Sequence, residues 1–188
     1  MIGETKLESE TTVDRDRWVT PRWIIEGPLW AYMKGLDLDP YYDPTGHTKP
    51  RVGLTVRPED CELVPWGTIE AGDGHTHDWT KYDRVWVQPP YSRGNVPRAM
   101  KQAKGYAQRR PDGHCIALIN CATGSQYWHD LVAPVAKAYV FPRRIDFEHS
   151  QLAKETSQRN DQAIILFAGS TERFAESFGG LGRVLIPR

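Results

Sequence analysis

The chain has 188 residues with 39% hydrophobic and 11% aromatic content, and its 24 basic and 24 acidic side chains give a formal net charge of +0. These values predict one folded α/β domain with a substantial core and exclude a disordered chain, while the neutral total excludes a strong overall attraction to nucleic acid. No apolar run approaches the roughly 20 residues that span a bilayer and no charged-then-apolar leader opens the sequence, so we expect a soluble, intracellular protein without a membrane partner.

The first segment predicts a tail followed by two short helices. Residues 1–17 are acidic and poor in large apolar groups, which is typical of a flexible tail, so we expect the folded domain to span 18–188. Thr20 and Pro21 predict a helix start, with Thr as the N-cap and Pro at the first helical position. A glycine–proline pair then breaks this helix, and a second short helix runs to Lys34.

A short strand that ends in carboxylates comes next. Residues 36–40 alternate Leu and Asp and end in Asp39-Pro40. The run 41–50 is rich in Asp, Gly, Thr and Pro, and it predicts a loop. Weak strand patterns follow at 52–56 and 62–65.

Residues 85–87 predict a buried strand that ends in a Gln-Pro-Pro-Tyr ledge. An ordinary turn after a strand uses Gly, Asn or Asp, whereas the consecutive Pro89 and Pro90 fix φ and hold Gln88 extended. The expected result is a rigid ledge with exposed carbonyls and with Tyr91 at its end.

This ledge suits an amine whose lone pair is delocalised into a heteroaromatic ring. Side-chain and backbone oxygens can accept both amino hydrogens, and Tyr91 can stack on the ring. The pattern therefore predicts methyl transfer to an exocyclic amine, with Gln88, Pro89, Pro90 and Tyr91 as the catalytic set. The alternative is a structural Pro-Pro turn with a packed Tyr.

The rest of the chain alternates helices with buried strands. We expect a helix over 96–110, a strand over 114–120, a helix capped by Ser125 and running through Val135, strands over 139–141, 145–147 and 163–167, a short helix through Phe174 and Phe178, and a last strand over 184–186. This order predicts a mostly parallel sheet with helices on both faces. Ligands bind such sheets beyond the carboxyl ends of the strands, where Asp39, Gln88 and Asn120 would cluster.

A basic segment begins at the ledge. No acidic residue lies between Asp83 and Asp112, while seven basic residues do: Arg84, Arg93, Arg98, Lys101, Lys104, Arg109 and Arg110. A surface that tracks phosphates beside an active site has this composition, and it makes Arg93, Arg98 and Lys101 candidate DNA contacts. The alternative is a solvated helix face.

Cysteine and histidine usage predicts neither a disulfide framework nor a metal site. Cys61, Cys115 and Cys121 are odd in number and lack a CxxC pair, so we expect free, mostly buried thiols. His75 and His77 have the alternate spacing of metal ligands, but their segment has the composition of a turn and offers no third ligand nearby. We expect no metal.

Six motifs, taken in order, resemble the phage and prophage DNA N6-adenine methyltransferase family (Dam-type). They are 18–21, 36–40, 73–74 with Trp79, 87–92, 141–147 and 165–169. The resemblance runs from about Trp18 to the end of the chain, and its specificity comes from the set and its order.

The resemblance implies a Rossmann-like methyltransferase that uses S-adenosylmethionine to methylate N6 of a flipped adenine in double-stranded DNA, in the cytoplasm or, for a phage-encoded chain, in that of the host. On the cofactor side the resemblance implies that Thr20 and Pro21 form the initial motif and that Asp39-Pro40 is the acidic strand end near the cofactor. Asp73 is a weaker candidate for a contact with the adenosine end of the cofactor. A carboxylate at the strand end can accept from ribose hydroxyls or face the methionine ammonium, and its alternative role is to cap the next loop. Arg144 or its neighbour Arg143 is implied as a backbone contact or a brace of the fold.

Gln88 departs from the family, which usually has Asn or Asp at that position. Gln keeps the amide acceptor but moves it one methylene outward, and a displacement of about 1 Å can cost on the order of a hundredfold in rate. A glycine-rich FxGxG loop is also absent, with 41–46 as a degenerate substitute. Two alternatives therefore stay open: a non-catalytic descendant that binds DNA or a protein partner, and a methyltransferase acting on a protein glutamine or an RNA base.

Overall fold

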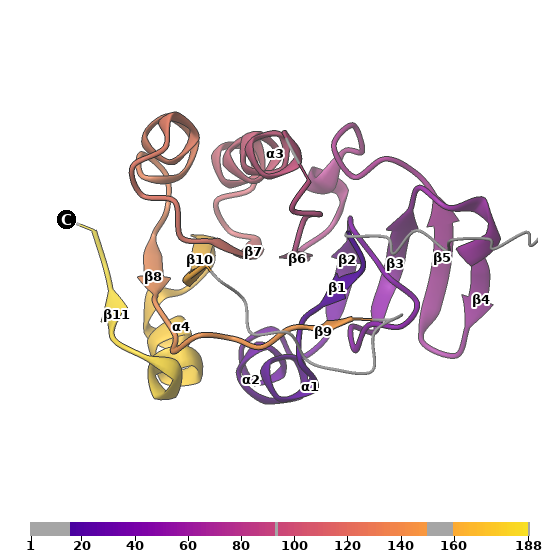
Figure 1. The fold of residues 1–188 in the computed structure, drawn as a ribbon, viewed down its shortest axis with the longest axis horizontal. Coiled ribbons are helices and arrows are strands. Elements are labelled where there is room, and N and C mark those ends of the chain that lie inside the picture. Colours follow the sequence, from indigo (N-terminus) through magenta and orange to yellow (C-terminus); the bar gives the residue numbers. More distant parts are fainter. Residues whose placement is uncertain (1–15, 93, 150–159, 188) are drawn as a thin grey trace, which may run out of the picture.

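The computed structural model describes residues 16–92, 94–149 and 160–187. The strands of the main sheet in this part of the chain are β2 (Leu36–Asp39), β3 (Pro50–Thr55), β4 (Glu62–Val64), β5 (Gly67–Ala71), β6 (Arg84–Val87), β7 (His114–Asn120), β8 (Ala138–Val140), β10 (Gln162–Ala168) and β11 (Val184–Leu185). Among the described residues they form one 9-stranded sheet in the order β11-β8-β10-β7-β6-β2-β3-β5-β4 (Figure 1). A separate ribbon pairs β1 (Trp18–Val19) with β9 (Glu148–His149).

The sheet is mixed, which corrects the prediction of a mostly parallel one. The centre, from β5 through β3, β2 and β6 to β7, is parallel. Strand β10 enters antiparallel between β7 and β8, and both β4 and β11 are antiparallel edge strands. An apolar run such as β10 has the same composition in either direction, so the pattern alone could not give its orientation.

The strand order reverses between β2 and β6. From β2 the chain adds β3 and β5 on one side, then returns to add β6 and β7 on the other. The carboxyl ends of β2 and β6 therefore diverge into different loops at this point, which leaves a crevice between them.

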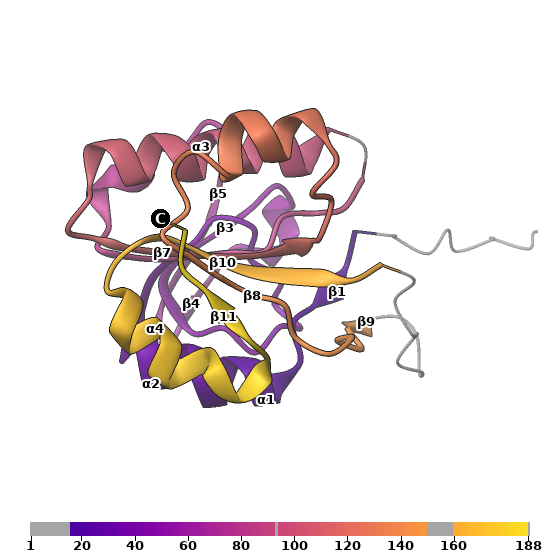
Figure 2. The same cartoon turned by 90° about the vertical axis from the view of Figure 1, so that its left-hand side faces the viewer.

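Helices cover both faces of the sheet, as the sequence predicted. The helical segments are α1 (Arg22–Ile24), the segment η1 (Ile25–Leu29) with a kink at the non-helical Gly27, α2 (Trp30–Met33), the 3₁₀ turns η2 (Pro58–Asp60) and η3 (Trp79–Lys81), α3 (Asn95–Arg109), the π-helical turn η4 (Trp128–Val132), α4 (Thr171–Phe178) and the 3₁₀ turn η5 (Gly179–Leu181). Figure 2 shows α3 on one face and α1, α2 and α4 on the other.

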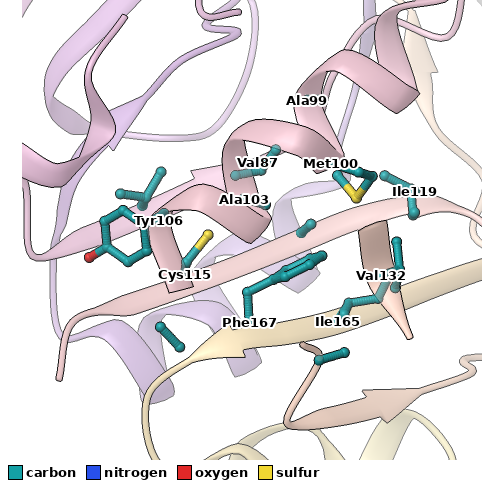
Figure 3. Close-up of a cluster of buried hydrophobic side chains, with 14 of the residues drawn as sticks. Val87, Ala99, Met100, Ala103, Tyr106, Cys115, Ile119, Val132, Ile165 and Phe167 are labelled. Atoms are coloured by element: carbon teal, nitrogen blue, oxygen red, sulfur yellow. The ribbon is translucent and has the colours of Figure 1, made fainter. Parts of the chain in front are cut away.

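Strand β7 is the centre of the core because both of its faces are buried. Its alternate residues Cys115 and Ile119 pack with Ala99 and Met100 of α3 (Figure 3). Leu118, on the opposite face, packs with the helices of the other layer. The uninterrupted apolar run of this strand follows from that double burial.

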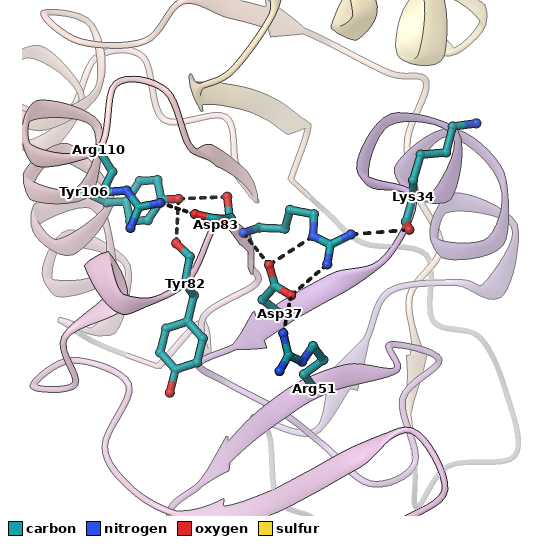
Figure 4. A network of polar contacts seen from close by, with 8 residues as sticks. Lys34, Asp37, Arg51, Tyr82, Asp83, Tyr106 and Arg110 are labelled. Atoms are coloured by element: carbon teal, nitrogen blue, oxygen red, sulfur yellow. Dashed lines mark hydrogen bonds and ion pairs between the residues drawn. The ribbon is translucent and has the colours of Figure 1, made fainter.

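The amino ends of β2 and β6 are joined by a partly buried ion pair. Arg84 donates from Nε to Asp37 Oδ2 at 3.0 Å and from Nη2 to Oδ1 at 2.8 Å (Figure 4). The hydrogen bonds from Arg84 lower the pKa of Asp37. Because these residues start β6 and β2, the pair braces the end of the sheet opposite the crevice.

Two predicted elements differ in the structure. Helix α1 has Pro21 at its N-cap position and begins one residue later than predicted, because the Thr20 hydroxyl donates to Gln88 and does not cap the helix. The predicted strand at 145–147 is instead a loop that ends in a single β-bridge residue, with Ile145 and Phe147 buried and Asp146 exposed. The Ile145 N–H donates to the Gln162 side chain, and the strand β9 follows.

Strand β5 lies in a region for which no strand was predicted. The predicted tail over 1–17 lies outside the described residues apart from Asp16 and Arg17, which contact the fold. None of the helices in the described part of the chain is both long and apolar enough to cross a bilayer.

Candidate active site

A cavity of about 410 Å³ opens at the carboxyl ends of β2, β3 and β6, where the strand order reverses. Most of the residues singled out from the sequence line it, namely Thr20, Asp39, Pro40, Asp73, Gln88, Pro89, Pro90, Tyr91 and Arg98. Ligands of open α/β sheets bind at this position. Pro21 is buried beside α1 and is not among the described residues that line the cavity.

The Gln88 amide is fixed at both ends by the amino-terminal strand. Its Nε2 donates to the Trp18 carbonyl at 2.7 Å, and the Thr20 hydroxyl donates to its Oε1. Because a carbonyl oxygen only accepts, these partners define which end of the amide is which. Oε1 keeps a second lone pair for another donor. The extra methylene of Gln therefore reaches partners that lie 70 and 68 residues upstream.

Tyr91 is half-buried at the end of the ledge. Its hydroxyl donates to the Leu118 carbonyl of β7 at 3.4 Å, and its ring packs edge-on against Phe147 with centroids 6.0 Å apart. Burial raises the pKa of the Tyr91 phenol well above its ordinary value, so it stays protonated. The ring lines the main cavity and also a second one described below.

Asp39 is buried at the end of β2, with 5% of its surface exposed. Its Oδ1 accepts from the Tyr41 backbone N–H at 3.1 Å and its Oδ2 accepts from the Thr48 hydroxyl at 2.7 Å. Burial raises the pKa of the Asp39 carboxyl to about 6. The side chain thus caps the following loop, and each oxygen keeps a lone pair directed at other donors.

The turn after β5 forms the opposite wall. Asp73 Oδ1 accepts from the His75 N–H at 2.8 Å, and Oδ2 lies 3.3 Å from Arg98 Nη2. Asn95 Oδ1 lies 3.1 Å from His75 Nε2, and the Tyr41 hydroxyl lies 2.9 Å from Nδ1. Since Asn95 Oδ1 can only accept, Nε2 carries the hydrogen and Nδ1 accepts from Tyr41. His75 is thereby a brace between loops.

The contacts that residues 16–19 make around the site were not predicted from the sequence, whereas Thr20, which follows them, was predicted as a site residue. Asp16 accepts from the Ser92 N–H at 3.0 Å, and Arg17 donates to Asp43 at 2.9 Å. The strand therefore contacts the ledge on one side of the cavity and the 41–48 loop on the other. Its only sequence signal is the set of short motifs that starts at Trp18.

The basic segment is largely compensated by acids from elsewhere in the chain. Four of its members have carboxylate partners: Arg84 with Asp37, Arg98 with Asp73, Arg109 with Asp78 at 4.0 Å, and Arg110 with Asp83. It is therefore not the uncompensated stripe suggested by its local sequence. Lys101 is exposed on α3, Arg144 lies 3.7 Å from Asp161, and Arg93 lies outside the described residues.

A second cavity, of about 490 Å³, lies at the carboxyl end of β7 and shares Tyr91 with the first. Asn120 and Cys121, which follow the apolar run of β7, line it together with Tyr127 and Asp161. Asn120 Oδ1 is buried and has no hydrogen-bond partner among the described residues.

A family model described as DNA N-6-adenine-methyltransferase (Dam) matches residues 59–180 of the 188-residue chain. The matched segment contains the ledge, Asp73 and the central strands β6, β7 and β10. No curated protein and no solved structure gives a significant match.

Proposed function

Because the family match covers more than half of its length, the chain belongs to the DNA N-6-adenine-methyltransferase (Dam) family, and on that basis we propose the following activity. The protein transfers a methyl group from S-adenosylmethionine to N6 of an adenine that is flipped out of double-stranded DNA. The observation that carries this proposal is the oriented Gln88 amide at the edge of a cavity located where the strand order reverses.

The central strand order supports a Rossmann-like fold. Numbered along the chain, β2, β3, β5, β6 and β7 stand in the order 3-2-1-4-5, which is that of a doubly wound nucleotide-binding sheet. The point of reversal separates a cofactor side, at the ends of β2 and β3, from a substrate side, at the ends of β6 and β7.

On the substrate side, Gln88 Oε1 accepts one hydrogen of the target amine. Thr20 fixes the amide so that the oxygen faces this hydrogen, which makes Thr20 a positioning residue. The N6 lone pair is delocalised into the purine ring, and accepting the amine hydrogens directs it toward the methyl donor. No covalent enzyme intermediate is needed. Tyr91 stays a neutral phenol and stacks on the base.

On the cofactor side, the donor set fits S-adenosylmethionine. The buried Asp39 carboxyl is ionised above about pH 6 and has free lone pairs for ribose hydroxyls or for the methionine ammonium. Pro40 and Asp73 line the same cavity and complete the proposed contacts. When bound, the cofactor supplies an electrophilic methyl group on a sulfonium.

Double-stranded DNA is the proposed partner. Lys101 and Arg98 extend from the first half of α3 beside the ledge, and we assign them, with Arg93 and Arg144, to phosphate contacts. Such contacts orient the duplex while the cavity selects the base.

Transfer of labelled methyl from S-adenosylmethionine to unmethylated duplex DNA, followed by digestion to nucleosides, tests the proposal. Label in N6-methyladenine is the expected result. Gln88→Met keeps the length of the side chain without its acceptor and should lower kcat on the order of a hundredfold. Gln126→Met, at an exposed position outside the cavity, is the matched control and should retain activity.

A second function is favoured by one observation, namely that both ends of the Gln88 amide already have partners. A non-catalytic descendant that binds DNA or a protein would keep this arrangement as a structural brace. Calorimetry separates the two, because DNA affinity without uptake of S-adenosylmethionine would support the binding role. Label recovered in RNA or in protein glutamine would support another acceptor.

A further inference from the structure

The unpaired oxygen of Asn120 calls for an explanation. Asn120 ends β7, and its Oδ1 is buried without a hydrogen-bond partner in the described part of the chain. Buried polar atoms in folded proteins almost always have a partner. Asn120 lines the second cavity, and although its Oδ1 is covered in this structure, rotation of the amide would present this unpaired acceptor to a ligand that brings its own donor.

The position of Asn120 is rigid. It pairs with Gln162 in the ladder between β7 and β10, and the next N–H, that of Cys121, donates to the Asp161 carbonyl at 2.7 Å. Gln162 is itself buried and accepts from the Ile145 N–H at 3.1 Å. The unpaired oxygen is thus held on a strand end fixed by backbone and side-chain hydrogen bonds, as a preorganised contact requires.

Asn120 faces the same side of the sheet as Gln88. Side chains two residues apart on a strand share a face, so Asn120 shares one with Leu118 on β7, and Gln88 shares one with Trp86 on β6. Leu118 and Trp86 belong to the same buried cluster. The two amides therefore end neighbouring parallel strands on one face.

Their spacing suits a single purine. Trp86 pairs with Ile116, so Gln88 lies opposite Leu118 and two residues short of Asn120. With strands about 4.8 Å apart and about 3.3 Å per residue, the two Cα atoms are roughly 8 Å apart. The hydroxyl of Tyr91 reaches the Leu118 carbonyl, which brings this ring to the same stretch of β7.

The chemistry of an asparagine amide matches adenine. The amino edge of adenine presents an N–H donor beside a ring-nitrogen acceptor, and an Asn side chain presents the complementary acceptor and donor. Guanine and thymine carry a carbonyl where adenine carries its amine, so their oxygen would face Asn120 Oδ1, whereas cytosine carries an amine beside a ring nitrogen and is not excluded by this contact. Adenine N6 has two hydrogens, and one acceptor for each would come from neighbouring strands.

We propose that Asn120 binds the target adenine, accepting one N6 hydrogen at Oδ1 while Nδ2 donates to the adjacent ring nitrogen. Gln88 accepts the other N6 hydrogen. This role rests on the proposed function. It places the amine of the base beside Tyr91, which lines both cavities, so that Gln88 contacts it from the first cavity and Asn120, as a catalytic and base-selecting residue, contacts it from the second.

The test compares Asn120 variants on duplexes that carry adenine, 1-deazaadenine or 7-deazaadenine at the methylated position. For the wild type, one of the two deaza bases should lower kcat/KM by roughly 10- to 100-fold, because breaking a bidentate contact to a base weakens its recognition by about that factor. Asn120→Leu should lower kcat/KM on adenine by a similar factor and should no longer distinguish adenine from that deaza base. Asn120→Asp keeps the shape without the donor and should lose the same discrimination.

Gln126→Leu, at an exposed position that lines neither cavity, is the control and should behave as wild type. Unchanged affinity for S-adenosylmethionine and an unchanged melting temperature verify that each variant is folded, and Asn120→Asp serves if Asn120→Leu does not fold. Activity of Asn120→Leu within twofold of wild type, or undiminished sensitivity to the deaza base, would overturn the assignment while the methyltransferase proposal stands. Wild-type protein that methylates no adenine would instead refute the proposed function, and the role of Asn120 with it.

Discussion

Replacing Asp39 by asparagine should make the protein more stable at neutral pH. Asn can keep both contacts of Asp39, since its oxygen accepts from the Tyr41 N–H and its amide donates to the Thr48 hydroxyl. What the substitution removes is a buried group whose ionisation is unfavourable in the folded state.

The magnitude follows from the pKa of Asp39. Burial raises it from 3.8 to about 6, which corresponds to roughly 3 kcal/mol. Because the pKa is higher in the folded chain, the contribution of this carboxyl to stability is fully present below pH 3.8 and is lost as the pH rises through about 6. Asp39→Asn and wild type should therefore have similar free energies of unfolding near pH 4. Near pH 8 the free energy of unfolding of the variant should be higher by up to about 3 kcal/mol.

Urea unfolding of both proteins between pH 4 and pH 8 measures this difference. The pH dependence of wild type alone does not isolate the effect of Asp39. Hydrogen bonds from Arg84 lower the pKa of Asp37, so the contribution of Asp37 to stability changes with pH in the opposite direction. The difference between wild type and Asp39→Asn removes this contribution. Asp37→Asn is the control. Its free energy of unfolding should fall further below that of wild type as the pH rises, because it lacks the stabilising ionisation of Asp37. Parallel curves for wild type and Asp39→Asn across the range would refute the reasoning.

Substitutions at three further positions have expected outcomes. Tyr91→Ala should lower kcat/KM by roughly 5- to 150-fold through lost base stacking. Tyr91→Phe loses only the 3.4 Å hydrogen bond to Leu118 and should stay within a few-fold of wild type. Steady-state methylation with calorimetric cofactor binding tests this, and equal losses in the two variants would count against stacking. Gln88→Asn is too short to reach both Trp18 and Thr20, so kcat should fall and tryptic cleavage after Arg17 should become faster; an unchanged digestion rate would contradict the brace. Arg84→Ala should lower the free energy of unfolding by about 2–3 kcal/mol through the lost hydrogen bonds to Asp37. Its kcat should be unchanged at a temperature at which the variant is folded. A drop in kcat would mean that the Arg84–Asp37 pair also shapes the site.

Local patterns predicted the core elements because burial acts on local composition. The apolar run of β7 and the spacing of Ala99, Ala103 and Tyr106 on α3 match the buried strand and the covering helix. Asp39 and Gln88 line one cavity, as their positions at strand ends predicted, whereas Asn120, which was predicted to cluster with them, lines the second cavity.

Long-range pairing was beyond the reach of the same patterns. The basic segment contains no acid of its own, yet Arg84 binds Asp37, 47 residues upstream. The direction of β10 and the existence of β5 depend on which strands lie beside them. The composition of the two segments likewise does not predict that Gln88 contacts the amino-terminal strand.

The chemistry of the ledge is set partly from outside the segment by which the family is identified. The matched region begins at residue 59, whereas both partners of the Gln88 amide, Trp18 and Thr20, lie upstream of it. Two family members with identical ledges could therefore differ in which lone pair their amide presents, according to the strand each carries at its amino terminus. A chain shortened to residues 59–180 would keep the ledge but would lose both partners of the Gln88 amide.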